Sequence, residues 1–366
     1  MNVWTSPHHG PMIASGMQHT CAYVEDSRCV GGFMQYRRGV ACWGSNQYGQ
    51  LSTASSASYS AAPVFVQETD VLSIAAGTYH TCVVTLRGEL YCWGDNIHGQ
   101  VGVSSASSPI GTPTRKFTGG VVQVVAGTDF TCALFANGLV SCWGNNAYGT
   151  LGRAQPVGCA NTTWDPSSTH AASPVIVGDT PTCFTENLSG VTQLSAGSHS
   201  VCARLATGRI RCWGRNPTVN HLNNVEPSRC YAGDASDRIY GCTGDPRFCG
   251  AAMCGLMSTN YAMEHAGPSL GGDGFAVSVS THEDGACAIL PNGALQCMGT
   301  GALGILGTGF TTARTGFGNV VGFDGATPTQ RVIAISGAGS TKCAVAASGR
   351  VRCWGWNGVA NAGASP

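Results

Sequence analysis

The chain has 366 residues, with 19 basic and 19 acidic side chains and a formal net charge of zero at pH 7. Charged residues make up 10% of it, against roughly 25% in ordinary soluble domains. We expect no nucleic-acid partner, because such a chain has no electrostatic field to hold a phosphate backbone. An apolar fraction of 43% argues against intrinsic disorder. No membrane span is expected, because no run of 18 apolar residues occurs.

The cysteine content indicates a secreted, extracellular protein. Nineteen cysteines favour disulfide bonds in an oxidising compartment, and the chain has no Cys-x-x-Cys pair of the kind found in common zinc and thioredoxin sites. N-glycosylation sequons at Asn161 and Asn187 agree with this location. Residues 1–12 have neither the basic nor the apolar region of a signal peptide, so we expect a processed form or a fragment.

Six related hairpins follow one another along the chain. The first intervals between them are 50 residues, a period typical of repeat architectures, and the longer intervals contain insertions. We expect the hairpins near residues 14–52, 72–102, 122–152, 192–216, 277–307 and 333–358, and the insertions at 22–38, 153–178 and 217–275. Each hairpin ends with Cys-Trp-Gly, or Cys-Met-Gly in the fifth, and has a second cysteine upstream. The six pairs are Cys21 with Cys42, Cys82 with Cys92, Cys132 with Cys142, Cys202 with Cys212, Cys287 with Cys297, and Cys343 with Cys353.

The spacing within one unit predicts where its disulfide lies. In residues 82–92 a run of alternating apolar residues precedes Arg87-Gly88 and another run follows, which indicates a β-hairpin. A three-residue loop ending in a left-handed glycine places Cys82 directly opposite Cys92. Opposite residues of a non-hydrogen-bonded pair have Cα atoms roughly 4.5 Å apart, within disulfide range. We therefore predict one disulfide in each hairpin.

The complete unit also has a strand-like run upstream and a glycine-rich link downstream, as in VLSIAAGTYHTC and CWGDNIHGQVG. These motifs and the period resemble the regulator-of-chromosome-condensation repeat, most closely its cysteine-bridged, secreted version. The second and third repeats match best, whereas the fifth has SVSTHEDGAC and Met298 in place of the tryptophan. The resemblance implies an all-β fold, in which residues 1–366 form a single closed β-propeller of about six blades, or seven as is usual in that family.

Repeated polar and aromatic residues are expected to be structural. One tryptophan per unit is predicted to pack between blades rather than to stack on a carbohydrate: Trp43, Trp93, Trp143, Trp213 and Trp354. Asparagines such as Asn46 and Asn96 are expected to bond the backbone of a turn, and His19, His80 and His199 to stabilise turns.

We expect no enzymatic activity, no cofactor and no metal site. No HExxH, GxSxG, P-loop or EF-hand motif occurs. His282-Glu283-Asp284 breaks the repeat pattern. This triplet is either an acid–base site or, as we favour, a variant turn.

Seven of the 19 cysteines lie outside the hairpin pairs. Cys159 and Cys183 are expected to form one bridge. Two further bridges are favoured over zinc among Cys230, Cys242, Cys249 and Cys254. Cys29 is left over in the first insertion, as a bond to a neighbouring subunit, a free thiol, or a member of another pairing scheme.

Two functional classes fit these features of the sequence. The first is a non-catalytic extracellular structural or interaction propeller, such as a repeating subunit of a surface filament, coat or matrix, whose partners are proteins including its own copies. The second is a soluble secreted binder, lectin-like or a protein inhibitor, that acts through aromatic residues on one propeller face and includes glycans among its ligands. Candidates for that face are Tyr48, Tyr148, Trp164, Tyr231, Tyr240 and Tyr261. Nucleotide exchange on a small GTPase, which the resemblance also implies, requires a reducing compartment and is not expected.

Overall fold

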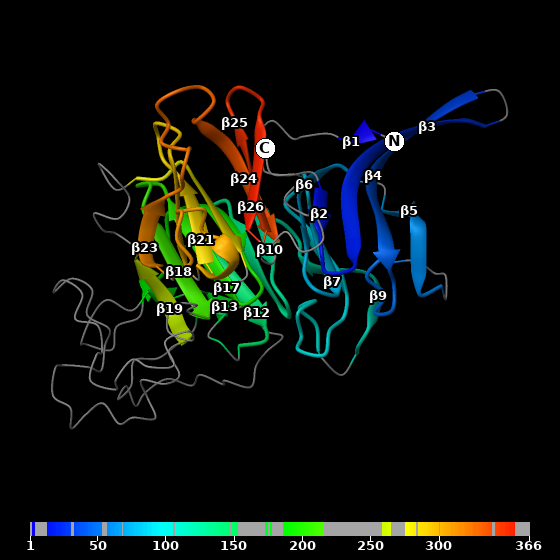
Figure 1. Ribbon diagram of the computed structural model, residues 1–366. Coiled ribbons are helices and arrows are strands. Elements are labelled where there is room, and N and C mark those ends of the chain that lie inside the picture. The colour runs from blue at the N-terminus through cyan, green and yellow to red at the C-terminus, as the bar shows by residue number, and fades with distance from the viewer. Residues whose placement is uncertain are drawn as a thin grey trace, which may run out of the picture. The chain divides into compact units, whose positions relative to one another are not determined.

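The described part of the chain is almost entirely β-structure, as expected (Figure 1). A single 3-10 turn, η1 (Ala302–Gly304), is the exception among these residues. The computed structural model describes residues 2–3, 13–30, 33–52, 57–67, 69–104, 107–146, 148, 150–152, 173–174, 176–177, 186–215, 258–264, 275–282, 285–299, 301–312, 314–338 and 341–355. They fall into two compact units, Met1–Ala147, Asp165–Val175 and Ser189–Ser198 in the first, and Tyr148–Trp164, Ile176–Leu188 and His199–Pro366 in the second. The single domain over residues 1–366 stays a prediction.

The first unit contains three antiparallel sheets whose strands mostly follow chain order. In each sheet a central hairpin pairs with a preceding and a following strand, which is the arrangement of a propeller blade. The first sheet consists of β1 (Asn2–Val3), β2 (Ile13–Ser15), β3 (His19–Val30), β4 (Phe33–Ser45) and β5 (Tyr59–Gln67). The second consists of β6 (Val71–Ala76), β7 (His80–Thr85), β8 (Leu90–Gly94) and β9 (Ile110–Phe117). The third consists of β10 (Val121–Ala126), β11 (Phe130–Phe135), β12 (Val140–Gly144) and β13 (Ser173–Pro174), and β16 (Val191–Ala196) lies beside β10.

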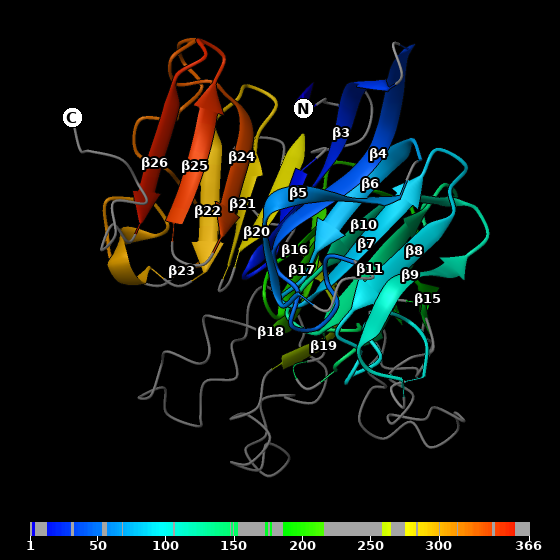
Figure 2. The ribbon, with the colours of Figure 1, turned by 90° about the vertical axis from the view of Figure 1, so that its right-hand side faces the viewer.

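The second unit repeats this plan, and Figure 2 shows its sheets from the side. Its first hairpin is β17 (Ser200–Leu205) and β18 (Ile210–Arg215), followed by β19 (Ser258–Glu264). The next sheet consists of β20 (Ser278–His282), β21 (Gly285–Ile289), β22 (Leu295–Gly299) and β23 (Arg314–Asn319). The last consists of β24 (Val332–Ala338), β25 (Thr341–Ala346) and β26 (Val351–Gly355). A short pair, β14 (Ile176–Val177) and β15 (Glu186–Asn187), completes the described strands.

The predicted hairpin register is confirmed, and with it one disulfide per hairpin. Cys82 lies opposite Cys92, and Gly88 in the turn between them has a φ of 75°. The glycine is required because this left-handed conformation strains a residue with a Cβ. The Cα atoms of the six bonded pairs are 4.0–4.1 Å apart. The bonds join Cys21 to Cys42, Cys82 to Cys92, Cys132 to Cys142, Cys202 to Cys212, Cys287 to Cys297, and Cys343 to Cys353.

The insertion at 22–38 lengthens the first hairpin instead of forming a separate loop. β3 and β4 stay in register from the pair His19 and Gly44 to the pair Val30 and Phe33. Cys29 lies opposite Met34 in this ribbon, so no cysteine faces it across the strands. The other cysteines outside the hairpins, Cys159, Cys183, Cys230, Cys242, Cys249 and Cys254, lie outside the described residues, and their pairing stays a prediction.

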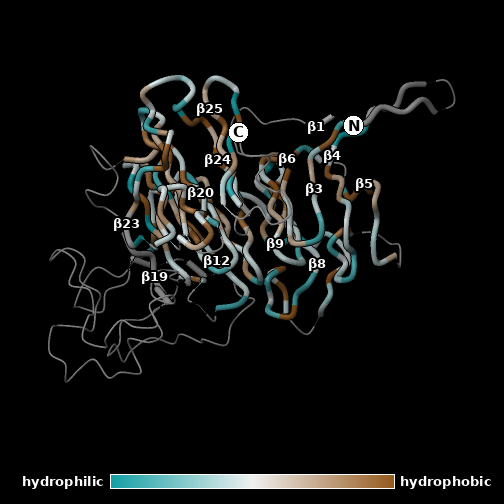
Figure 3. Tube along the Cα trace, viewed as in Figure 1, coloured by the Kyte–Doolittle hydropathy of each residue, from teal (hydrophilic) through white to brown (hydrophobic). Residues whose placement is uncertain are grey.

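The hydrophobic core lies between consecutive repeats. Leu90 of the second repeat packs with Val121 and Trp143 of the third, so a sheet buries one face against the sheet that follows it. β7 is consequently buried at every position, and Figure 3 shows apolar stretches along the strands of both units. Among the described residues, no helix has the length and apolar character needed to cross a membrane.

The disulfides differ in their exposure, which predicts the order in which they are reduced. Cysteines of the first five hairpins are 0–9% exposed, whereas Cys343 and Cys353 are half-buried. Under limiting reductant without denaturant, we expect the Cys343–Cys353 bond to be reduced first, because a thiolate must reach the sulfur. Alkylation followed by peptide mass spectrometry measures the order. Equal labelling of Cys82 and Cys343 at early times would contradict this assignment of exposure.

Candidate interaction surface

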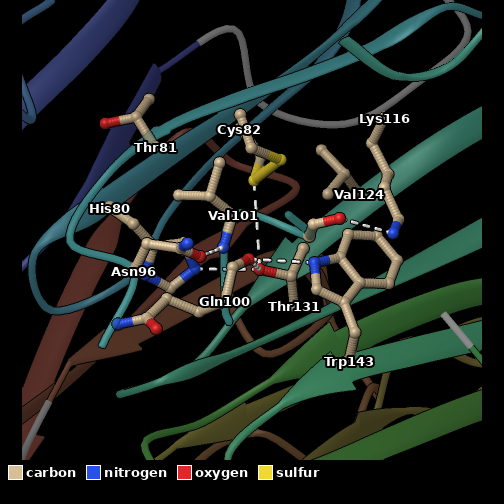
Figure 4. Close-up of a disulfide and its surroundings, with 12 residues drawn as sticks. His80, Thr81, Cys82, Asn96, Gln100, Val101, Lys116, Val124, Thr131 and Trp143 are labelled. Carbon is tan, nitrogen blue, oxygen red and sulfur yellow. Dashed lines mark hydrogen bonds between the residues drawn. A yellow bond between two sulfur atoms is a disulfide. The ribbon is translucent and has the colours of Figure 1, made fainter. Parts of the chain in front are cut away.

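Three hydrogen bonds join the second repeat to the third beside the Cys82–Cys92 disulfide (Figure 4). The indole Nε1 of Trp143 donates to the carbonyl of Gln100 at 2.9 Å. The hydroxyl of Thr131 donates to the same carbonyl at 2.8 Å. The imidazole Nε2 of His80 lies 2.9 Å from that hydroxyl oxygen. One backbone carbonyl of the second repeat therefore accepts hydrogen bonds from two side chains of the third repeat.

The direction of these bonds fixes the state of His80. Thr131 gives its single hydroxyl proton to Gln100, so its oxygen accepts the proton of His80 Nε2. Nδ1 of His80 is then unprotonated, and it is buried with no hydrogen-bond partner among the described residues. Burial lowers the pKa of His80 to about 3 and that of His19 to about 4, so both imidazoles are neutral at physiological pH.

Other repeats also have the carbonyl acceptor, but the residues at the histidine and threonine positions around it vary. His19, Thr81 and Gln50 form the same chain of bonds, and Trp93 donates to Gln50 at 2.8 Å. The histidine position of the third repeat holds Phe130 and the threonine position of the fourth holds Val201, and both are buried. An apolar residue at each position leaves no buried polar group there without a partner. Trp213 still donates to the carbonyl of Thr150 at 3.0 Å.

The fifth repeat exchanges the positions of histidine and glycine. In the second repeat the turn begins at Gly77 and ends at His80, whereas in the fifth His282 pairs with Gly285. In both cases the imidazole lies against the glycine, where a Cβ would collide with the ring. His282 of the His282-Glu283-Asp284 triplet lies in β20 and is 3% exposed, and the interpretation of the triplet as a variant turn stays a prediction. Glu283 and Asp284 lie outside the described residues.

A buried lysine takes the place of threonine in the sixth repeat. Lys342 is 1% exposed, and its Nζ donates to the carbonyl of Ile305 at 2.7 Å. Trp354 donates to the same carbonyl at 3.1 Å. Burial lowers the pKa of Lys342 to about 7, while burial and the nearby ammonium hold the pKa of His282 well below its usual range. The contact between the fifth and sixth repeats therefore contains the side-chain amine of Lys342, which is less basic than that of an ordinary lysine.

The tryptophans fall into two groups. Trp93, Trp143 and Trp213 are 0–1% exposed, whereas Trp43 and Trp354 are half-buried. The asparagine prediction is confirmed: Asn96 accepts a bond from the amide of Val101 and donates to three carbonyls of the following link. Sequence reasoning missed the threonines and the carbonyl acceptors. The recurring His-Thr-Cys motif pointed to the threonine, but a backbone acceptor leaves no residue signature.

Three side chains of the first unit, two half-buried tyrosines and one exposed methionine, form a partly exposed cluster. The rings of Tyr48 and Tyr79 are 4.6 Å apart with an interplanar angle of 31°. The hydroxyl of Tyr79 donates to the sulfur of Met17 at 3.7 Å, and Met17 is 69% exposed. We call Met17, Tyr48 and Tyr79 the Tyr79 cluster. Aromatic and thioether groups of this kind are enriched in protein interfaces.

The equivalent contact in later repeats has a different chemistry. His98 Nε2 lies 3.8 Å from a carboxylate oxygen of Asp129, and in the second unit the rings of Tyr148 and His199 are 4.8 Å apart. Of the aromatic residues predicted for a binding face, Tyr48 and Tyr148 thus occupy equivalent positions. Tyr261 lies in β19, and Trp164, Tyr231 and Tyr240 lie outside the described residues.

Acid–base and metal chemistry find no support in the described residues. No group of three or more His, Cys, Asp or Glu side chains that could hold a metal ion occurs among them. The histidines that sequence analysis placed at turns are instead buried between repeats, as His19 and His80 show.

Family models of the regulator of chromosome condensation (RCC1) repeat match residues 71–100, 121–150 and 191–217, and residues 40–84 and 87–134. The chain therefore contains RCC1 repeats over these residues. Yeast RCC1 (Prp20), solved bound to Kap60, is 18% identical with a TM-score of 0.66, over 97% of this chain and 71% of that one. Human WBSCR16 is 19% identical with a TM-score of 0.61, over 89% of this chain and 69% of that one. These similarities show an RCC1-type β-propeller fold. No curated protein matches the chain.

The His80–Thr131 pair predicts a non-additive response to mutation. Thr131→Val alone leaves the buried imidazole N–H without an acceptor, so we expect a loss of about 1–3 kcal/mol in the free energy of unfolding. His80→Phe combined with Thr131→Val copies Phe130 and Val201, and we expect it to recover most of that loss. Urea unfolding at pH 7 with the disulfides intact measures Thr131→Val, His80→Phe and the double variant. Simple addition of the two single effects would contradict the pairing.

The same double variant is expected to reduce acid sensitivity. The folded-state pKa of His80 lies below the usual 6.5, so the unfolded chain binds the proton first as the pH falls. Stability is therefore lost progressively below about pH 6.5. Unfolding measured at pH 7 and pH 5 should show a smaller difference for the double variant than for the unmodified chain.

Lys342 predicts a dependence of the same sign at neutral and alkaline pH. The buried amine releases its proton near pH 7, whereas an unfolded lysine keeps its proton up to about pH 10. Because the unfolded state then binds more protons, stability should rise with pH above 7. Lys342→Thr, which restores the residue of the second and third repeats, should flatten this rise between pH 7 and 9. Lys116→Thr, at the only other lysine, is the control and should change the slope less. Equal slopes for the unmodified chain and Lys342→Thr would contradict the assignment.

Proposed function

We propose that the chain is a non-catalytic extracellular propeller that works by binding other proteins. The observation that carries the proposal is the disulfide found in each of the six described hairpins. Such bonds persist in oxidising compartments and are rare in the cytosol and nucleus. RCC1-type propellers bind proteins, as the structure of yeast RCC1 (Prp20) with Kap60 illustrates for that protein.

The Tyr79 cluster is the surface that we assign to this binding. Its members are uncharged, and the rings of Tyr48 and Tyr79 are already in tilted contact before a partner arrives. A preformed aromatic pair loses little side-chain entropy on binding, and tyrosines carry much of the binding energy at protein interfaces. His98 and Asp129 at the neighbouring turns supply the polar groups that a rim requires.

Within this function we favour a structural role, as a repeating subunit of a surface filament, coat or matrix. A chain with 10% charged residues has little charge repulsion to keep its copies apart. Cys29 adds a thiol that no cysteine faces across its own ribbon. We propose that other subunits, including copies of the same chain, are its partners.

A glycan at Asn187 agrees with the same compartment. Asn187 and Ser189 of the sequon are exposed, and Leu188 between them is 1% exposed, so the buried leucine holds both polar residues at the surface. Asn161 lies outside the described residues, and its modification stays a prediction.

A soluble binder of proteins or glycans is the second candidate, and the tyrosine pair favours it. Partly exposed aromatic rings also bind carbohydrate, and the neighbouring Gln18 is exposed and able to form hydrogen bonds with hydroxyl groups. Both candidate functions use the Tyr79 cluster. The class of ligand that binds to the cluster, protein or glycan, therefore distinguishes one function from the other.

Substitution of the cluster tests the function. The tagged chain is isolated from the extracellular fraction of its source together with its bound proteins, as the unmodified form, as Tyr48→Ala combined with Tyr79→Ala, and as Tyr59→Ala. Tyr59 is 62% exposed and lies on β5, outside the cluster, so it is the matched control. We expect the double variant to lose its partner by about tenfold or more and the control to retain it.

Three results would count against the proposal. One is reduced hairpin cysteines in native material, which would remove the extracellular compartment. Another is equal partner recovery from both variants. A glycan-array signal that the double variant abolishes, with no protein partner recovered, would favour the second candidate instead.

A further inference from the structure

Two stretches of the first unit have a low-complexity composition. Each covers the link after the third strand of a repeat and the beginning of the fourth strand, at residues 52–63 of the first repeat and 103–114 of the second. Six of the twelve residues in each stretch are serine or threonine, most of the others are alanine or proline, and none is charged. Serine- and threonine-rich stretches with proline are typical of O-glycosylated segments. The contacts of the described hydroxyl groups show which of them is available for this modification.

Thr112 lies in a bulge of β9, the outermost strand of the second sheet. β9 pairs on one side only, with β8. Between the paired residues Ile110 and Thr114, β9 has three residues where β8 has one, and such an excess forms a bulge. Thr112 in its centre is exposed, and Gly111 before it has open space where a Cβ would lie. The bulge is therefore accessible to an enzyme that modifies side chains.

The hydroxyl of Thr112 differs from two neighbouring hydroxyls in its hydrogen bonding. Among the described residues, it has no hydrogen-bond partner. The hydroxyl of Thr114 donates to the backbone carbonyl of Thr112 at 3.1 Å. The hydroxyl of Ser108 donates to a carboxylate oxygen of Asp95 at 3.1 Å and accepts a bond from the amide of Asn96 at 3.0 Å. Of these three hydroxyls, only that of Thr112 can react without breaking a bond within the protein.

The proline after Thr112 restricts its backbone. A residue that precedes proline is confined to extended conformations, so Pro113 keeps the backbone of Thr112 extended. The first repeat has Ala62 and Pro63 in the same places of β5. Both repeats therefore have the proline, whereas only the second has a hydroxyl before it.

We propose that Thr112 is an O-glycosylation site, at which a sugar is transferred from an activated sugar phosphate to the threonine hydroxyl. Oγ1 attacks the anomeric carbon of the donor and forms a C–O bond. The bond from that carbon to the donor's phosphate oxygen breaks, and the phosphate group leaves with the electron pair. The hydroxyl proton passes to a base of the transferase. The inference rests on the extracellular location proposed above and adds a modification to it.

A sugar at Thr112 would protect the outer edge of the second sheet. An edge strand has backbone groups that no strand of its own sheet covers, and such edges pair readily with other chains. Charged side chains often prevent this pairing, but residues 110–114 of β9 contain none. A hydrophilic sugar in the bulge keeps other strands away from this edge, so copies of the chain must contact one another elsewhere.

A second Thr-Pro-Thr sequence provides an internal control. It consists of Thr327, Pro328 and Thr329 and precedes β24. Thr327 is exposed like Thr112. Its hydroxyl donates to Oε1 of Gln330 at 2.6 Å and lies 2.9 Å from the hydroxyl oxygen of Thr329. Because this hydroxyl is already bonded within the protein, we expect Thr327 to remain unmodified.

Peptide mapping of the chain from the extracellular fraction of its source tests the inference. Trypsin cleaves after arginine and releases residues 88–115 and 315–331 as separate peptides, each with one Thr-Pro-Thr sequence. Electron-transfer fragmentation assigns a sugar to a single residue. We expect most copies of the peptide 88–115 to carry a sugar on Thr112, and the peptide 315–331 to carry none.

Two variants extend the test. Thr112→Ala copies Ala62 of the first repeat and should remove the sugar from the peptide 88–115. Thr114→Ala is the matched control and should retain it, because Thr112 is then still present with its hydroxyl free. Alkylation before reduction shows in the same peptide whether Cys92 is oxidised, so the compartment is measured independently of the sugar.

The possible failures are distinguishable. An unmodified Thr112 in a peptide with oxidised Cys92 would overturn the O-glycosylation site and leave the extracellular propeller standing. A reduced Cys92 would overturn the extracellular location and the site together. Equal occupancy at Thr112 and Thr327, or a sugar on Thr114 in place of Thr112, would overturn the selection of the site by its free hydroxyl.

Discussion

At four junctions between consecutive repeats, one backbone carbonyl accepts the hydrogen bond that joins them, and the hairpin register places its donors. In the second and third repeats, Trp143 and Thr131 both donate to the carbonyl of Gln100. These two donors face each other across the hairpin and stand beside Cys142 and Cys132. The disulfide that fixes the hairpin register therefore also fixes the two donors relative to each other. A buried carbonyl must find its partners within the protein, so a slip of one residue would remove both at once.

The variation between repeats shows which part of this contact is indispensable. The indole bond to the carbonyl recurs from Trp93 to Trp354, while the second donor is a threonine hydroxyl in two interfaces and a lysine ammonium in the last. The histidine that bonds to this hydroxyl is replaced only where the threonine is replaced as well. Buried polar groups are thus exchanged as complete units, which avoids the cost of a single unsatisfied member.

Sequence alone was sufficient for the hairpins and insufficient for what joins them. The ten-residue cysteine spacing and Gly88 determined the pairing of Cys82 with Cys92 because turn geometry and register are local properties. The acceptor role of Gln100 was not predictable, since the acceptor is its backbone carbonyl and any residue type has one. The burial of Lys342 was not predicted, because a lysine usually occupies an exposed position. Tyr79 was missed because its place in the turn holds Gln18 and Asp129 in the adjacent repeats, so no repeated residue type marked the surface.

The disulfides also act on the packing between sheets. In repeat proteins each unit is stabilised by its neighbours. The covalent bond between Cys343 and Cys353 holds the last hairpin in register by itself, so this register does not depend on packing against another sheet. A face that is already in register loses less entropy when it is covered. The disulfides therefore do more than strengthen the interior, because they keep each sheet in the register that its contact with the next sheet requires.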